Sequence, residues 1–285
     1  MAVSLSSIYL DAFYKCAITG NFTKASEKLA ITQSALSQRI KNLEDDLSVS
    51  LFIRSRSGIK LTEAGSELLR YCQRKTAMES ETVQNMLNPL NTELNGTIRI
   101  GGYSSVMRSA ILPALAPLVE KNSAIKIYFL SREIYELPAL LKSGEIDFMF
   151  LDHDIQREDL ISKKVGIERN ILIQGKNYSG PELYLDHDED DQTTQKYISK
   201  FKGKTKFERS YYDDSYGIIE AVRLGLGKAI IPYHLIKDDK DFSVIDKGSQ
   251  MQNPVVLHYY RQDFYTKLQQ AVISYLEQGC KNFLY

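Results

Sequence analysis

The sequence predicts an α/β protein in three parts: a winged helix-turn-helix domain of all-α type at the amino terminus, a long linker helix, and a two-lobed α/β domain. Residues 32–47 follow the period of an amphipathic helix, residues 63–90 form one long polar-rich helical run, and strands alternate with helices from residue 97 onward. The expected domains are residues 1–62 for the winged helix-turn-helix, 63–95 for the linker helix and hinge, 96–152 with 263–285 for the first lobe, and 153–262 for the second lobe.

The first element of the amino-terminal domain that the sequence marks clearly is a short helix opening at residues 21–23. Thr23 is its expected N-cap, and Ala25 and Leu29 lie on its apolar side. Only residues 30 and 31 separate it from the next helix, and so short a turn is typical of a helix-turn-helix unit. Helix pairs of this kind also occur inside ordinary helical cores, so this feature alone leaves both interpretations open.

The next helix, over residues 32–47, has a clear start and one apolar stripe. Thr32 stands at the N-cap position, where its hydroxyl can accept a bond from a backbone NH, and Ala35 excludes a reciprocal capping box. Because apolar side chains recur at steps of four, three and four, they lie on one face and pack against a core. These side chains are Leu36, Ile40, Leu43 and Leu47.

The opposite face of this helix is polar and carries no carboxylate until its last turn. Its side chains are short amides and hydroxyls with one cation, which can bond to base edges and phosphates. The acidic residues 44–46 are confined to the far end. This face predicts contact with duplex DNA, and the candidate residues are Thr32, Gln33, Ser34, Ser37, Gln38 and Lys41.

A basic hairpin follows. Residues 51–61 are two short apolar runs around a Ser/Gly turn, and they carry Arg54, Arg56 and Lys60. Cations at the tip of a β-hairpin can reach the sugar-phosphate backbone or a minor groove while the helix lies in the major groove. The plainer alternative is a basic hairpin on a solvated surface.

Residues 21–65, NFTKASEKLAITQSALSQRIKNLEDDLSVSLFIRSRSGIKLTEAG, resemble the winged helix-turn-helix of LysR-type transcriptional regulators over their whole length and without a gap. Two stretches, ITQSALSQRI at residues 31–40 and residues 111–117, are similar to the lysine- and arginine-responsive exporter regulators of that family. Many members carry proline where Ser34 stands, so a stiffened helix start does not carry over. By position, the resemblance implies that Gln33, Ser34, Ser37 and Gln38 read DNA and that Arg54 and Arg56 hold its backbone.

Composition sets the outer bounds. The 285 residues are 43% hydrophobic and 25% charged, which is enough for two or more globular units. The net charge is zero, but residues 1–65 hold eight Lys/Arg and six Asp/Glu, so this segment is slightly positive. The start of the chain lacks a signal-peptide pattern and no run approaches a membrane span, so cytoplasmic residence is expected. The three cysteines lie far apart, which favours free, buried thiols.

The linker helix over residues 63–90 is the candidate dimerising element. One phase of an imperfect heptad is Leu69, Thr76, Val83 and Leu90, and its companion positions are Cys72, Glu79 and Met86. So short a pattern also suits packing against another domain, whereas the resemblance implies a dimerising helix here. One winged module contacts little DNA, so a homodimer or homotetramer on paired half-sites is expected.

From residue 97 the pattern indicates strands at 97–100, 125–130 and 146–151 and helices at 106–120 and 133–142. Right-handed crossovers between them predict a parallel sheet with binding loops at its carboxyl edge. A second α/β unit follows, and a final helix at 264–278 returns to the first lobe. The resemblance implies an effector domain like the periplasmic solute-binding proteins, with the ligand between the lobes.

Polar side chains cluster after these strands and before helices, where hydroxyls and free NH groups can hold a carboxylate. Acidic groups opposite would suit an amino acid, and the alternative for each residue is a helix cap or a surface charge. The candidate effector-binding residues are Ser104, Ser105, Ser131, Arg132, Glu133, Asp152, Asp213 and Asp214.

Other patterns carry no further chemistry. The acidic residues 186–191 lack the spacing of a calcium-binding loop, so a solvated loop is expected there. Residues 224–227 are typical of the end of a helix and not of a phosphate-binding loop. No histidine has a nucleophile beside it in the sequence pattern, so no catalytic residue, metal or cofactor is expected. The expected partners are double-stranded promoter DNA and a small-molecule effector, with RNA polymerase open. The rival interpretation is a solute-binding or enzymatic α/β protein whose amino-terminal helices serve only assembly.

Overall fold

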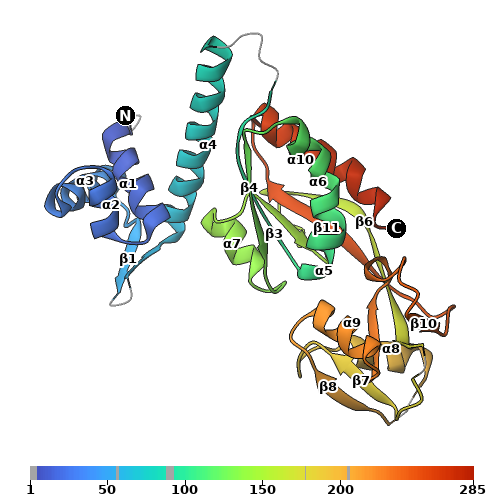
Figure 1. Cartoon of the computed structure of the whole chain (residues 1–285). Helices are drawn as coiled ribbons and strands as arrows, with labels where there is room; N and C mark the ends of the chain where they lie inside the picture. Colours follow the sequence, from blue (N-terminus) through green and yellow to red (C-terminus); the bar gives the residue numbers. More distant parts are fainter. Residues whose placement is uncertain (1–4, 56–57, 88–92, 177, 204–205) are drawn as a thin grey trace.

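The computed structural model describes residues 5–55, 58–87, 93–176, 178–203 and 206–285, and of residues 54 and 55 the backbone only. Along the chain lie a small helical domain, the long helix α4, and an α/β domain drawn out into two lobes (Figure 1). This arrangement confirms the predicted fold class. No helix in the described ranges is long and apolar enough to cross a membrane.

The amino-terminal domain contains α1 (Ser7–Thr19), α2 (Phe22–Lys28), α3 (Gln33–Leu47) and a hairpin of β1 (Phe52–Ser55) and β2 (Gly58–Leu61). The predicted cap of α2 was wrong: Asn21, not Thr23, caps the helix, and its Oδ1 accepts the Lys24 backbone NH at 3.0 Å. Asn21 stands two residues before Thr23, so the helix starts earlier and the amide at its third position is the one that is capped. The turn between α2 and α3 closes through Ala30, whose φ of 53° is left-handed.

The apolar stripe of α3 forms the core of this domain, as predicted. Leu36 and Ile40 are fully buried and Leu43 is 1% exposed, and they pack with α1 and the first turns of α4. Gly65 allows the close approach of α4 to the hairpin, because a Cβ there would lie 2.2 Å from the Leu51 carbonyl oxygen. Leu69 and Cys72 also belong to this core, so the first part of the heptad packs inside the domain.

Helix α4 (Glu63–Leu87) leaves that core and becomes exposed towards its end. Met78, Val83, Met86 and Leu87 are between 43% and 74% exposed. Of the predicted heptad, Leu90 lies outside the described residues. The exposed apolar groups of the second half of α4 are therefore available to a partner.

The α/β domain is built on one mixed sheet of order β4-β3-β5-β11-β6-β9-β7-β8. In the first lobe β3 (Gly96–Gly102) pairs in parallel with β4 (Ile125–Ser131) and β5 (Phe148–Leu151). In the second lobe β7 (Leu183–Asp186) pairs in parallel with β8 (Glu208–Tyr211) and β9 (Lys228–Pro232).

Two long strands join the lobes and run antiparallel, unlike the three strands of the first lobe, whose predicted parallel pairing is confirmed. The strands β6 (Leu160–Gly175) and β11 (Met251–Tyr260) pair antiparallel to each other, β11 pairs antiparallel to β5, and β6 pairs antiparallel to β9. The strand β10 (Phe242–Ile245) also pairs with β6. The chain therefore crosses between the lobes along one antiparallel ribbon (Figure 1).

Helices cover the sheet in both lobes. The first lobe has α5 (Ser104–Val106), a π-helical stretch at Met107–Ile111, α6 (Leu112–Lys121), α7 (Leu137–Ser143) and, from the end of the chain, α10 (Lys267–Gly279), which packs beside α6. The second lobe has α8 (Thr193–Phe201) and α9 (Ser215–Arg223). Helix α7 begins four residues later than predicted because Pro138 fits only the first turn of a helix.

Candidate nucleic-acid interface and effector cleft

The polar face of α3 lies open to solvent over its first half. Thr32, Gln33, Ser34, Gln38 and Lys41 are exposed, and Ser37 is half-buried. Thr32 is the N-cap that the sequence predicted: its Oγ1 accepts the Ala35 backbone NH at 3.1 Å and lies 3.0 Å from the Ser34 hydroxyl. We call these six residues the reading face.

A chain of side-chain bonds holds the amide of Gln38. Its Nε2 donates to Asn42 Oδ1 at 2.7 Å, and Asn42 Nδ2 donates to the Tyr9 hydroxyl of α1 at 3.1 Å. Gln38 is exposed and its amide oxygen has no partner in the described structure, so the bond to Asn42 leaves an acceptor free on an oriented amide. No local sequence pattern predicts the roles of Asn42 and Tyr9, because the two positions lie 33 residues apart.

The hairpin is fastened to the far end of α3. Glu44 Oε1 accepts the backbone NH groups of Leu51 at 2.7 Å and Phe52 at 3.4 Å, so this carboxylate positions the hairpin. The ring of Phe52 packs 5.3 Å from that of Phe13. The backbone of Arg54 lies in β1, whereas its side chain and the whole of Arg56 lie outside the described residues.

The candidate effector residues lie at the ends of strands and the starts of helices in the two lobes. Ser104 and Ser105 open α5 after β3, Ser131 ends β4, and Asp152 follows β5. Asp213 and Asp214 precede α9 in the second lobe. The polar groups of the first lobe therefore share one sheet edge, as parallel strands require.

Some of these side chains have local partners. Asp214 caps α9, accepting the Tyr216 backbone NH at 2.7 Å and the Gly217 NH at 3.2 Å. Arg132 donates to the Ser131 carbonyl at 2.8 Å. Asp152 lies 2.7 Å from His153 Nδ1. Asp213 is exposed and has no bonding partner in the described part of the chain.

A buried polar network links the two lobes behind Ser105. The Ser105 hydroxyl donates to Glu168 Oε1 at 2.8 Å, and the same oxygen lies 2.9 Å from His234 Nε2. The other ring nitrogen of His234 lies 2.7 Å from the Ser109 hydroxyl. Glu168 is 5% exposed and His234 7%, so burial leaves these groups dependent on one another for their hydrogen bonds.

Further side chains lie where the two lobes approach each other. Arg108 of the first lobe lies 4.5 Å over the ring of Tyr216 in the second, and Glu133 lies 3.9 Å from His187 Nε2 across the lobes. The Tyr103 hydroxyl is buried without a hydrogen-bond partner among the described residues. Burial raises the pKa of Tyr103 well above its ordinary value, and nearby negative charges add to the shift.

Sequence patterns alone missed five groups in this region: Tyr103, Arg108, Glu168, His187 and His234. Glu168 lies within β6, and no local feature of the sequence distinguishes it from a strand residue that faces solvent. The acidic loop after β7 also differs from the prediction: Asp186 is 2% exposed and pairs with Thr194 and Arg209 instead of facing water. Among the described residues no group of three or more His, Cys, Asp or Glu side chains could hold a metal.

An exposed polar helix in a helix-turn-helix domain, joined to two α/β lobes that face each other, defines the class of helix-turn-helix proteins with a two-lobed small-molecule-binding domain. The comparisons identify the family within this class. "Bacterial regulatory helix-turn-helix protein, lysR family" matches residues 9–66, and "LysR substrate binding domain" matches residues 91–281. The chain belongs to the LysR family, which confirms the resemblance.

Known relatives agree with this assignment. The chain is 28% identical over 169 residues to the "HTH-type transcriptional activator AaeR" of Escherichia coli (strain K12), covering 59% of this chain, so it spans about half (53%) of the length of that relative. The structure of ArgP from Mycobacterium tuberculosis is 19% identical with a TM-score of 0.82, covering 99% of both chains. LysG from Corynebacterium glutamicum with bound effector Arg is 18% identical with a TM-score of 0.76, covering 98% of this chain and 99% of that one.

Proposed function

We propose that the protein is a transcriptional regulator that binds promoter DNA through the reading face and the β1-β2 hairpin, as a homodimer or homotetramer. The observation that carries this proposal is the exposed, carboxylate-free surface of α3 from Thr32 to Lys41. Such a surface can bond to base edges without repelling the phosphates. Residence in the cytoplasm and contact with RNA polymerase belong to the same proposal.

We further propose that a small carboxylate or amino acid in the effector cleft changes the binding of DNA. Ser104 and Asp213 face the cleft region with few local bonds, and arginine is the effector named for the LysG structure of similar fold. A ligand held by both lobes changes their relative angle, and this angle sets the spacing of the DNA-binding domains in an oligomer. The other candidate residues support or line this site; they are Ser105, Ser131, Arg132, Glu133, Asp152 and Asp214.

A salt-titrated gel-shift assay with promoter DNA tests the main proposal. Gln38→Ala and Arg54→Ala should each weaken binding, and Arg54→Ala should also reduce the slope of affinity against salt because one phosphate contact is lost. Lys196→Gln is the matched control, since Lys196 is exposed on α8 in the second lobe. If Gln38→Ala and Arg54→Ala both bind like the wild type at every salt concentration, the DNA-binding proposal is wrong. The result would then favour the rival interpretation, a solute-binding or enzymatic protein whose amino-terminal helices serve assembly.

A further inference from the structure

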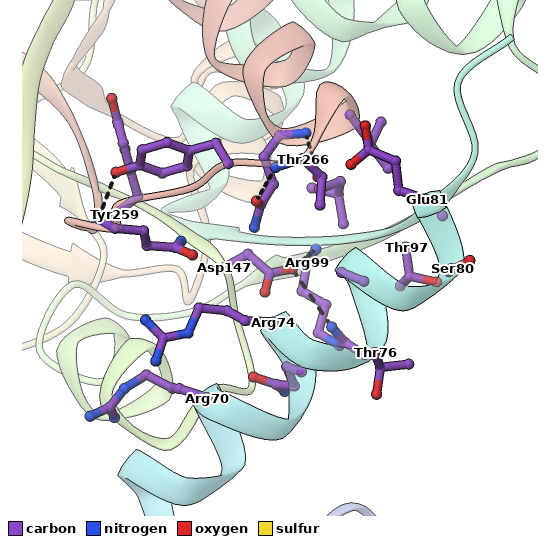
Figure 2. Close-up of a pocket in the computed structure, with 18 of the residues that line it drawn as sticks. Arg70, Arg74, Thr76, Ser80, Glu81, Thr97, Arg99, Asp147, Tyr259 and Thr266 are labelled. Atoms are coloured by element: carbon purple, nitrogen blue, oxygen red, sulfur yellow. Dashed lines mark hydrogen bonds and ion pairs between the residues drawn. The ribbon is translucent and has the colours of Figure 1, made fainter. Parts of the chain in front are cut away.

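A second cavity lies between α4 and the first lobe (Figure 2). Its volume is about 810 Å³, within the range that small molecules occupy in proteins. Thr97 and Arg99 line it at the amino-terminal half of β3, whereas Ser104 and Ser105 follow the carboxyl end of the same strand. The cavity is therefore a different site from the effector cleft.

Most carboxylates that line this cavity already have partners. Asp147 Oδ2 accepts the Arg99 backbone NH at 2.8 Å and lies 3.7 Å from the Arg99 guanidinium. Glu81 of α4 accepts the backbone NH of Lys267 at 3.3 Å, at the start of α10. Asp159 is paired with Arg157. Each of these negative charges is compensated by groups of the protein itself.

Two arginines of α4 are in a different situation. Arg70 and Arg74 lie one turn apart, and Figure 2 shows their side chains reaching from α4 side by side. The Arg70 guanidinium lies 4.5 Å over the ring of Tyr260 and donates to the Lys142 carbonyl. Arg74 is exposed and has no hydrogen-bond or ion-pair partner within the described ranges. Arg70 has negative charges near it, since Glu67 lies one turn away and Arg70 helps to lower the pKa of Glu63 and Asp159, whereas Arg74 lies two turns from Glu67.

Like charges one helical turn apart repel each other, and an anion between them removes that cost. A carboxylate suits this position because a guanidinium donates two parallel hydrogen bonds to it. The apolar part of the lining is small: Leu141, Ile146, Phe148 and Tyr259 are at most 5% exposed, so they and Tyr260 present only their edges to the body of a ligand.

We propose that this cavity is a second small-molecule site, which binds a monocarboxylate with an apolar ring or chain through Arg70 and Arg74. The occupied site holds α4 against the first lobe. Existing contacts already join these parts: Gln73 Nε2 donates to the Gly144 carbonyl at 2.8 Å, and Lys142 pairs with Glu63 at 2.6 Å. A bound carboxylate adds a bridge midway along α4. The binding of the ligand is independent of the proposed function, and only its effect on DNA rests on it.

The test is ligand-observed ¹⁹F NMR of 4-fluorobenzoate with the full-length protein, using neutral 4-fluorobenzamide of the same shape as the probe control. We expect the benzoate to bind and the amide not to bind. Arg74→Gln should weaken benzoate binding about tenfold or more, because a charge-assisted contact is lost. Lys75→Gln is the matched variant, since Lys75 pairs with Glu79 at 2.8 Å and lies outside the lining.

A variant of the effector cleft separates the two sites. Ser104→Ala can lose only benzoate that binds in the effector cleft, and it should keep the binding that Arg74→Gln removes. The proposal is overturned if the wild type binds no benzoate, if the amide binds equally, if Arg74→Gln binds normally, or if Ser104→Ala abolishes binding. Gel shifts of the same variants without ligand keep this result distinct from a failure of the DNA-binding proposal.

Discussion

At the scale of single residues, several acidic side chains serve the fold where the sequence could not distinguish between a fold role and a surface role. Glu44 looks like one of three solvated acids at a helix end, yet it binds two backbone amides of the hairpin. Asp214 was a candidate ligand and is a helix cap. The role of such an acidic side chain depends on partners that folding brings close to it, and a local sequence pattern does not predict these partners.

Glu44→Ala should loosen the hairpin without unfolding the domain. The amides of Leu51 and Phe52 would lose their charged acceptor, a loss of about 2 kcal/mol of local stability. Hydrogen exchange of the peptide that spans both amides should therefore quicken about thirtyfold. Asp46→Ala is the control, because Asp46 is exposed and its side chain makes no hydrogen bond or ion pair with the described residues. Equal exchange in the two variants would contradict the role of Glu44.

His258 should make the stability of the first lobe dependent on pH. Burial lowers the pKa of His258 below its ordinary value near 6.5, although Asp154 partly opposes the shift. The folded protein therefore keeps this ring neutral, while the unfolded chain takes up a proton as the pH falls below about 6.5. Stability is full above that pH and declines as the pH falls towards the lower, folded-state pKa.

Thermal unfolding between pH 8 and pH 5 measures this dependence. His258→Gln should be less stable at pH 8 but lose less stability on acidification. His153→Gln is the control, since His153 is exposed. An unchanged slope for His258→Gln would show that another group carries the pH dependence.

At the scale of elements, periodicity predicted α3 almost to the residue, because its stripe of apolar side chains and its Thr32 cap are local features. It did not predict β6 as one strand. In the first eight residues of β6 only Leu160 and Val165 are buried, whereas six of the last eight are buried, because the strand leaves one lobe core and enters the next. A hydrophobic pattern that changes along one strand predicts separate segments instead of a single strand.

Gly65 shows how one element limits another. Gly65→Ala should destabilise the amino-terminal domain by about 1–3 kcal/mol, because its methyl group would meet the Leu51 carbonyl oxygen of the hairpin. The expected readout is a lower melting temperature of the helical domain by circular dichroism. Gly248→Ala is the matched change, since nothing lies within 4 Å of a Cβ at that glycine. Equal melting temperatures of the two variants would mean that the hairpin moves away from the added methyl group without a loss of stability.

At the scale of the whole molecule, the exposed end of α4 should form the contact between copies of the chain. Val83 and Leu87 are 51% and 72% exposed and lie one turn apart on this helix. Apolar groups so placed on a long helix are typical of a helix-helix interface. Val83→Glu with Leu87→Glu should therefore shift the oligomer towards the monomer in sedimentation velocity.

Glu67→Gln, also on α4, leaves the apolar surface intact and should sediment like the wild type. A double variant that keeps its oligomeric state would place the interface elsewhere. The sequence could suggest α4 as a dimerising element only through the resemblance, because its heptad is imperfect and Leu69 and Cys72 are used by the domain core.

The antiparallel ribbon of β6 and β11 has a mechanical consequence for the α/β domain. Since both connections between the lobes run through this pair of strands, any rotation of one lobe must bend or twist their shared ladder. The register is interrupted between Val255 and Val256, opposite residues 164–166, and an irregular ladder there resists bending least. We expect the lobes to pivot at this irregularity, close to Glu168 and the Ser105 hydroxyl bonded to it, so a molecule that competes for this hydrogen bond should act close to the axis of rotation.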